Sequence, residues 1–129
     1  MSTWIVIGVG GAVGAMARHG VNVVVHHHWP LMRFPLGTVV VNLVGCFVIG
    51  ALAGLIASGT LTMRLPWREL VFVGVIGGFT TFSTFGLDTI TLLRTSDYGP
   101  AIGNVALQVV GGLAGTYLGL VFGEAVGGR

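Results

Sequence analysis

Four long apolar segments constrain the fold of this 129-residue chain more than any other feature. A helix that crosses the hydrocarbon core of a bilayer, about 30 Å thick, needs about 20 mostly apolar residues. Each segment reaches that length with at most one aspartate, glutamate, lysine or arginine. We therefore expect an all-α membrane protein whose four transmembrane helices cover residues 4–25, 36–57, 70–93 and 101–122.

The composition excludes a soluble domain. Charged residues make up 8% of the chain, whereas a soluble domain carries roughly 25%. Because the apolar content recurs along the whole length, a signal peptide does not explain it. The six basic residues are all arginines that stand apart, so no basic stripe indicates a nucleic-acid partner. We expect one four-span domain over residues 1–129, embedded in the lipid of a cell inner or plasma membrane.

The arginines that flank the spans do not indicate an orientation in the membrane. With four spans both termini lie on one side, and Arg18 counts on the other because its head group would extend outward from the first span. Each side then carries three arginines: Arg64, Arg68 and Arg129 against Arg18, Arg33 and Arg94. Since flanking arginines normally set orientation, the balance favours dual topology, with an antiparallel homodimer of oppositely inserted copies. The alternative is a single orientation set by a weaker signal.

Small and polar residues recur at helical spacing inside the spans. Glycines four apart, such as Gly10 and Gly14 or Gly50 and Gly54, predict close helix packing in lipid. Polar groups in a membrane are costly unless they bind one another or line a wet path. Polar side chains share one face in three spans: Thr38, Asn42 and Cys46; Thr80, Thr84 and Asp88; Asn104 and Gln108.

Two of these polar stripes lead to different expectations. Asn42 lies six residues into an uncharged span, about 9 Å deep at 1.5 Å per residue. Its amide offers two donors, which favours a functional role for Asn42. For Asn104 and Gln108, interhelical hydrogen bonding and pore lining are equally open.

The segment Gly77–Phe85, GGFTTFSTF, is the least helical stretch inside a span. Its two glycines and four hydroxyls weaken helical hydrogen bonding, so we expect the third helix to break there. A break in lipid persists only where it is buried in protein or lines an aqueous site, and its freed carbonyls can bind a cation. Phe79, Phe82 and Phe85 lie three residues apart, and the positive edges of phenyl rings can solvate a small anion. The segment therefore indicates an ion path.

GGFTTFSTF in a third span resembles the signature of the Fluc fluoride channels, also called the CrcB family. The resemblance extends over essentially the whole chain, with Gly37-Thr38 followed by Asn42 and Gly45 in the second span and Arg18 towards the end of the first. It implies a dual-topology homodimer with two fluoride pores and a structural sodium ion at the two-fold axis.

The resemblance also implies roles for individual residues. Phe82 and Phe85 would present ring edges along the pore, and Asn42 would be the amide donor. Ser83 and Thr84 would form a hydroxyl track, and Arg18 would be the basic residue near the pore entrance. The backbone carbonyls of Gly77 and Thr80, doubled by symmetry, would hold the sodium ion. The chain departs from the family pattern at four positions: Cys46, Gly86, Asp88 and Gln108.

Other function classes fit the sequence less well. A small dual-topology exporter, coupling protons to fluoride or to drugs, is the alternative, but multidrug coupling needs a deep carboxylate and the spans offer only Asp88. Gly8, Gly10 and Gly14 are spaced one residue too long for a dinucleotide-binding turn. Ser83 has no histidine near it in sequence for nucleophilic catalysis. We expect no enzyme, but a passive fluoride channel that relieves fluoride toxicity.

Overall fold

The structure, a computed structural model, describes residues 2–128, and within these the chain folds into helices and connecting loops without any strand. Four helical stretches are long and apolar enough to cross a membrane: Thr3–His28, Leu36–Ala57, Glu69–Arg94 and Tyr98–Gly127. The predicted all-α fold with four candidate spans is confirmed. The second span has the predicted bounds, while the other three helical stretches extend beyond theirs because flanking residues such as His26–His28 continue the helix.

The four candidate spans differ in regularity. The first two are single helices, α1 (Thr3–His28) and α2 (Leu36–Ala57). The third comprises the π-helical segment η1 (Glu69–Ile76), the short α3 (Gly77–Phe79) and α4 (Phe82–Arg94). The fourth comprises α5 (Tyr98–Ala106), the π-helical η2 (Leu107–Gly111) and α6 (Gly112–Gly127).

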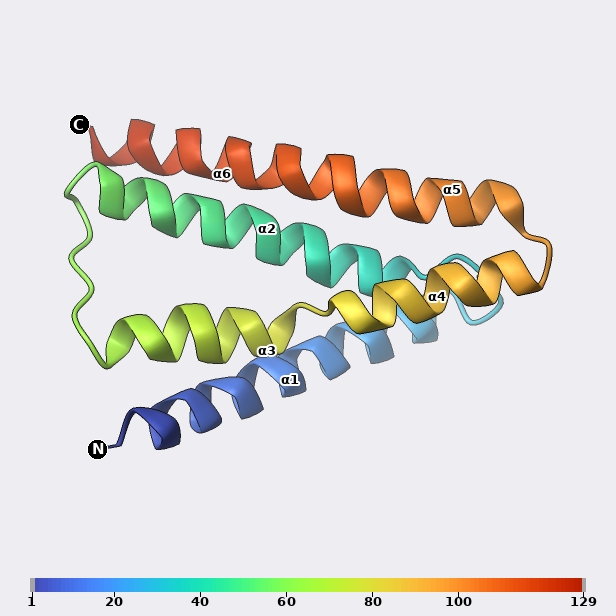
Figure 1. The fold of residues 1–129 in the computed structure, drawn as a ribbon, viewed down its shortest axis with the longest axis horizontal. Coiled ribbons are helices and arrows are strands. Elements are labelled where there is room, and N and C mark those ends of the chain that lie inside the picture. The colour runs from blue at the N-terminus through green and yellow to red at the C-terminus, as the bar shows by residue number, and fades with distance from the viewer. Residues whose placement is uncertain (1, 129) are drawn as a thin grey trace.

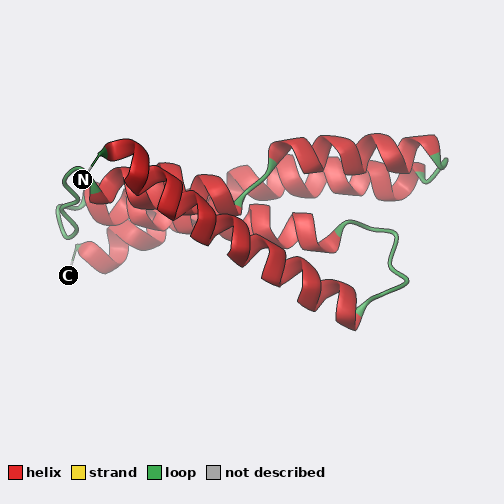
Figure 2. Cartoon of the chain, turned by 90° about the horizontal axis from the view of Figure 1, so that it is seen from below, coloured by secondary structure: helices red, strands yellow, loops and turns green. Residues whose placement is uncertain are grey.

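The chain runs back and forth along one long axis (Figure 1). Both chain ends and the loop at 58–68 lie at one end of the molecule, and the loops at 29–35 and 95–97 lie at the other. Figure 2 shows the same elongated bundle from below, with the α4 and α5 pair standing apart from the α1 and α2 ends. An even number of spans accounts for the placement of both termini at one end.

Glycines bring the helix backbones into direct contact. The main pairs are α2 with α6, α1 with η1 and α3, and α4 with α5. A Cβ added at Gly14 would meet the Val75 carbonyl oxygen, and one at Gly50 would meet the Thr116 carbonyl oxygen. Because only glycine leaves room for these backbones, the close packing predicted from the four-residue spacing is confirmed at both positions.

Large apolar side chains point outward over much of the surface. Leu31 is 94% exposed, Trp4 85% and Phe82 81%, whereas the only fully buried large side chains in residues 2–128 are Val41 and Asn104. A helix that is apolar on all sides is typical of a membrane span. With its four apolar helices, the chain is a multi-pass membrane protein.

Thr80 and Thr81 separate α3 from α4. Both have extended backbones, with φ −82° and ψ 161° at Thr80 and φ −154° and ψ 116° at Thr81. The Thr81 hydroxyl accepts a hydrogen bond from the Thr84 backbone N–H at 3.3 Å, so Thr81 is the N-cap of α4. Gly77 and Gly78 themselves remain helical. We call Thr80-Thr81 the interruption of the third span.

Candidate ion pathway

Asn42, on α2, holds the interruption through two hydrogen bonds to one residue. The Thr81 backbone N–H donates to Asn42 Oδ1 at 2.8 Å, and Asn42 Nδ2 donates to the Thr81 carbonyl at 2.9 Å. The extended backbone takes the Thr81 N–H away from the Gly77 carbonyl, its partner in a continuous helix, and a carboxamide can accept from this N–H while also donating to the Thr81 carbonyl. Asn42 therefore fixes the interruption against α2.

A chain of side-chain hydrogen bonds continues from Asn42 across three further elements. Asn42 Nδ2 also donates to Gln108 Oε1 on η2. Gln108 Nε2 donates to Asn104 Oδ1 at 2.7 Å, and Asn104 Nδ2 donates to Thr89 Oγ1 at 2.9 Å. We call these four residues the amide chain. Of the two interpretations left open for Asn104 and Gln108, interhelical hydrogen bonding is confirmed.

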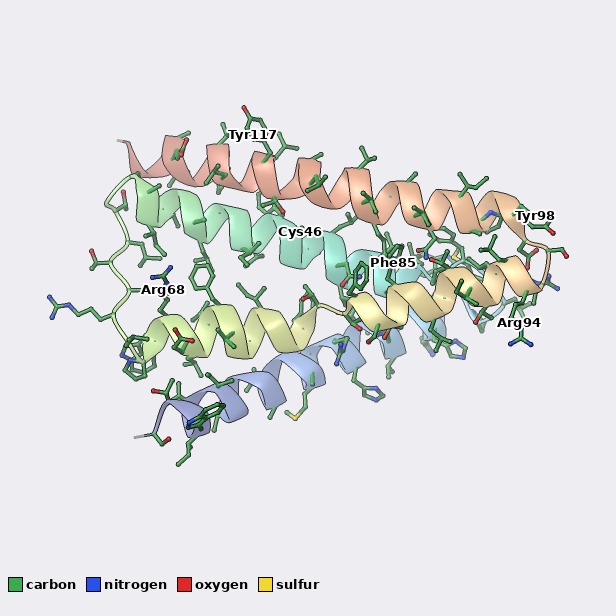
Figure 3. The ribbon with its side chains drawn as sticks, in the orientation of Figure 1. Cys46, Arg68, Phe85, Arg94, Tyr98 and Tyr117 are labelled. Carbon is green, nitrogen blue, oxygen red and sulfur yellow. The ribbon has the colours of Figure 1, made fainter. Side chains whose placement is uncertain are left out.

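Two phenyl rings and the Asn42 amide line one pocket beside the interruption. This pocket, which we call the ring pocket, has a volume of about 290 Å³, and its walls include Asn42, Thr81, Phe82, Phe85 and Gln108. The centroids of the Phe82 and Phe85 rings are 5.3 Å apart, with 53° between the ring planes. Figure 3 shows Phe85 at the start of α4, on the side towards α2. The structure thus brings together three predicted pathway residues from two helices, Asn42 from α2 and the two phenylalanines from α4.

A larger polar pocket of about 660 Å³ lies between α1, α4 and the chain that enters α2. Its walls carry Arg18, Arg33 and Asp88, and also Thr81 and Thr84. Thr81 lines both pockets, so the interruption stands between the polar pocket and the ring pocket. The Thr38 hydroxyl donates to Asp88 Oδ2 at 2.8 Å, which gives this carboxylate a partner inside the bundle.

Arg18 reaches inward to the interruption. Its Nη1 donates to the Thr80 carbonyl at 3.1 Å, and the side chain is half-buried on the wall of the polar pocket. The expectation that its head group extends outward from the first span was therefore wrong. The extended backbone at Thr80 exposes a carbonyl that attracts the guanidinium. The contact places a positive charge beside the interruption.

The hydroxyls predicted to form a track gather around Thr81. The Thr81 hydroxyl donates to Thr84 Oγ1 at 3.0 Å, and Ser83 Oγ lies 3.3 Å from Thr81 Oγ1. Thr84 lines the polar pocket, whereas Ser83 is exposed and lines neither this pocket nor the ring pocket. The three hydroxyls form a cluster at the start of α4 rather than a row along it.

The Gly77 carbonyl fits a hard cation, and the Thr80 carbonyl, which already accepts from Arg18, has one lone pair left for it. They lie where α3 ends, and helix ends leave carbonyls without N–H partners. The N–H that would bond the Gly77 carbonyl in a continuous helix belongs to Thr81 and donates to Asn42 instead. Freed carbonyls of this kind suit sodium.

Sequence reasoning did not single out Thr81, which contacts both pockets and Asn42. The available signal was its position two residues before Ser83 and three before Thr84, where a threonine can cap the following helix. It also did not pair Asn42 with Gln108, because the register between antiparallel helices is set by packing rather than by local sequence.

Comparison with known proteins places the chain among membrane channels. A family model described as CrcB-like protein, Camphor Resistance (CrcB), matches residues 5–120. A protein of Chloroflexus aurantiacus named Fluoride-specific ion channel FluC is 40% identical over 99% of this chain and 100% of its own length. Proteins of the same name from Opitutus terrae and Methylobacillus flagellatus are each 44% identical, over 92% and 88% of this chain and 90% and 88% of their own lengths.

Proposed function

This chain belongs to the CrcB family, and we propose that it is a fluoride-selective channel through which fluoride leaves the cell passively, relieving fluoride toxicity. The ring pocket is the observation that carries the proposal, because it sets an amide donor beside two phenyl rings next to the interruption of a membrane span. The names of full-length relatives support the same function.

The chemistry of the ring pocket suits a small, strongly hydrated anion. Burying an ion is costly unless its hydration is replaced by converging donors. Asn42 supplies an N–H donor, and the edges of Phe82 and Phe85 carry the positive part of the aromatic quadrupole. Weak contacts that are spread over several positions bind an ion loosely enough for it to move from one to the next.

The polar pocket would deliver the anion to the interruption. Arg18 and Arg33 outnumber the single carboxylate of Asp88 on its walls, and although Arg33 pairs with Asp97 at 3.3 Å, Arg18 leaves positive charge that attracts anions. Within the hydroxyl cluster, Thr84 lines this pocket and Thr81 lines both pockets, so these two hydroxyls can donate hydrogen bonds to fluoride on its way, with Ser83 beside them.

We further propose that the working unit is an antiparallel dual-topology homodimer in the inner or plasma membrane, with the interruption near mid-membrane. Phe82 is 81% exposed on the single chain, which a partner subunit would cover. The carbonyls of Gly77 and Thr80 from both copies would hold the structural sodium ion. Sodium, when bound, would supply positive charge between the two copies.

Ion efflux from proteoliposomes tests the proposal. Liposomes loaded with potassium fluoride should release fluoride when a potassium ionophore lets potassium follow, and the same liposomes loaded with potassium chloride should retain chloride. A passive channel carries charge, so efflux without the ionophore should be slow. Fast efflux driven by a pH gradient alone would identify a fluoride–proton exchanger instead. Equal release of both anions would contradict fluoride selectivity.

A further inference from the structure

The Asn42 amide has two N–H groups, and both are hydrogen-bonded. One N–H of Nδ2 donates to the Thr81 carbonyl, and Oδ1 accepts from the Thr81 N–H. These two bonds prevent the amide from turning, because rotation would break both. The remaining N–H donates to Gln108 Oε1, another wall of the ring pocket. An anion can therefore bind Asn42 only by taking the place of Gln108.

The orientation of Gln108 is fixed from its other side. Its Nε2 donates to Oδ1 of Asn104, which is 0% exposed and is itself bonded to Thr89. This contact turns the Gln108 nitrogen away from Asn42 and its carbonyl oxygen towards it. The negative end of the carbonyl dipole thus faces the donor that fluoride would use, which disfavours an anion there.

We propose that Gln108 gates the fluoride path by occupying the available donor of Asn42, so that fluoride reaches Asn42 only when the Asn42–Gln108 hydrogen bond opens. The inference rests on the proposed function. Gln108 also belongs to η2, and π-helical segments within α-helices occur often at functional sites. A purely structural role for Gln108 would predict a loss of stability on substitution and no gain in flux.

A matched pair of variants separates gating from structural support. Gln108→Met keeps the length of the side chain but removes the oxygen that accepts from Asn42, and fluoride efflux should rise roughly fivefold, the order of one net hydrogen bond. Thr116→Val removes another part-buried hydrogen bond of the fourth span, from the Thr116 hydroxyl to the Gly112 carbonyl, and Thr116 lines neither pocket. Its efflux should stay within about twofold of the parent rate, well under the effect of one net hydrogen bond at the site itself. Chloride should be retained by both variants.

The outcomes distinguish this inference from the proposed function. If the parent protein passes no fluoride, the proposed function fails. If the parent passes fluoride and folded Gln108→Met is no faster, or if Thr116→Val gains equally, the gating role of Gln108 is wrong. A measurement on the parent protein alone keeps the test decisive should the variant not fold. In 15N-resolved NMR, sodium fluoride should shift the side-chain amides of Asn42 and Gln108 together, and a shift of Asn42 without Gln108 would overturn the inference.

Discussion

Asn42 shows how one side chain can join structure to function. Its carboxamide satisfies the N–H and the carbonyl of Thr81 and turns its remaining N–H towards Gln108 in the ring pocket. The depth of Asn42 in an uncharged span predicted an important role. The residue it would bind could not be predicted, because the contact depends on the register of α2 against the third and fourth spans.

Replacing Asn42 by leucine should lower both stability and flux. The Thr81 N–H would lose its acceptor, at a cost of about 1–3 kcal/mol for a buried group left unsatisfied. Thermal unfolding in detergent measures the first effect, and fluoride efflux at a temperature where the variant is folded measures the second. Unchanged efflux would show that fluoride does not use the Asn42 amide.

The phenyl rings can be tested without changing charge. Phe82→Ile and Phe85→Ile remove the ring edges but keep an apolar side chain, so fluoride efflux should fall at least tenfold, the loss expected from about 1.4 kcal/mol of anion contact in the barrier. Phe122→Ile is the control, because Phe122 packs on Phe47 and lines neither the ring pocket nor the polar pocket. Equal effects at all three positions would assign the rings to packing alone.

At the scale of elements, two threonines rather than two glycines form the interruption. Composition identified the segment, because hydroxyls and glycines disfavour a helix interior, but Gly77 and Gly78 are helical and Thr80-Thr81 are extended. Asn42 and the Thr81 cap stabilise this particular position. The helix propensity of a short segment does not include contacts from another helix, so it could not predict which residues would be extended.

Thr81→Val tests the cap. Valine has nearly the same shape but cannot accept from the Thr84 N–H, so the first turn of α4 should lose about 1 kcal/mol of stability. Hydrogen exchange at residues 82–85 should become faster, while exchange within α2 stays unchanged. Unaltered exchange at 82–85 would mean that the cap contributes nothing.

Close helix packing predicts opposite effects on stability for alanine substitutions at two glycines of α1. A Cβ at Gly14 would overlap the Val75 carbonyl oxygen, so Gly14→Ala should force α1 away from the third span and cost about 1–3 kcal/mol. A Cβ at Gly8 would meet no atom within 4 Å, so Gly8→Ala should leave the stability unchanged or slightly higher. Thermal unfolding of the two variants compares them directly, and equal losses would contradict the packing.

For the whole molecule, the sequence predicted the number of spans better than the direction in which individual side chains point. Long apolar runs define four helices regardless of tertiary contacts, whereas the turn of Arg18 towards Thr80 depends on an exposed carbonyl in another span. Arg64 and Arg68 fall in the loop near the chain ends, and Arg33 and Arg94 fall at the other end (Figures 1 and 3). Arg129 lies outside the described residues.

Dual topology can be measured from one cysteine. Cys46 is the only cysteine, so Cys46→Ala with Ser58→Cys places a single thiol in the loop at 58–68. A maleimide that cannot cross membranes should label about half of the copies in intact cells, because the described flanking arginines, Arg64 and Arg68 against Arg33 and Arg94, give no preferred orientation. Labelling of all copies, or of none, would show a single orientation.

The reversal potential in a planar bilayer tests the central claim, passive conduction selective for fluoride, most directly. With a tenfold fluoride gradient and equal chloride and pH on both sides, the current should reverse near 59 mV, the potential of about 59 mV per tenfold gradient for a singly charged ion. Reversal near zero, or the absence of any current from active protein, would contradict it.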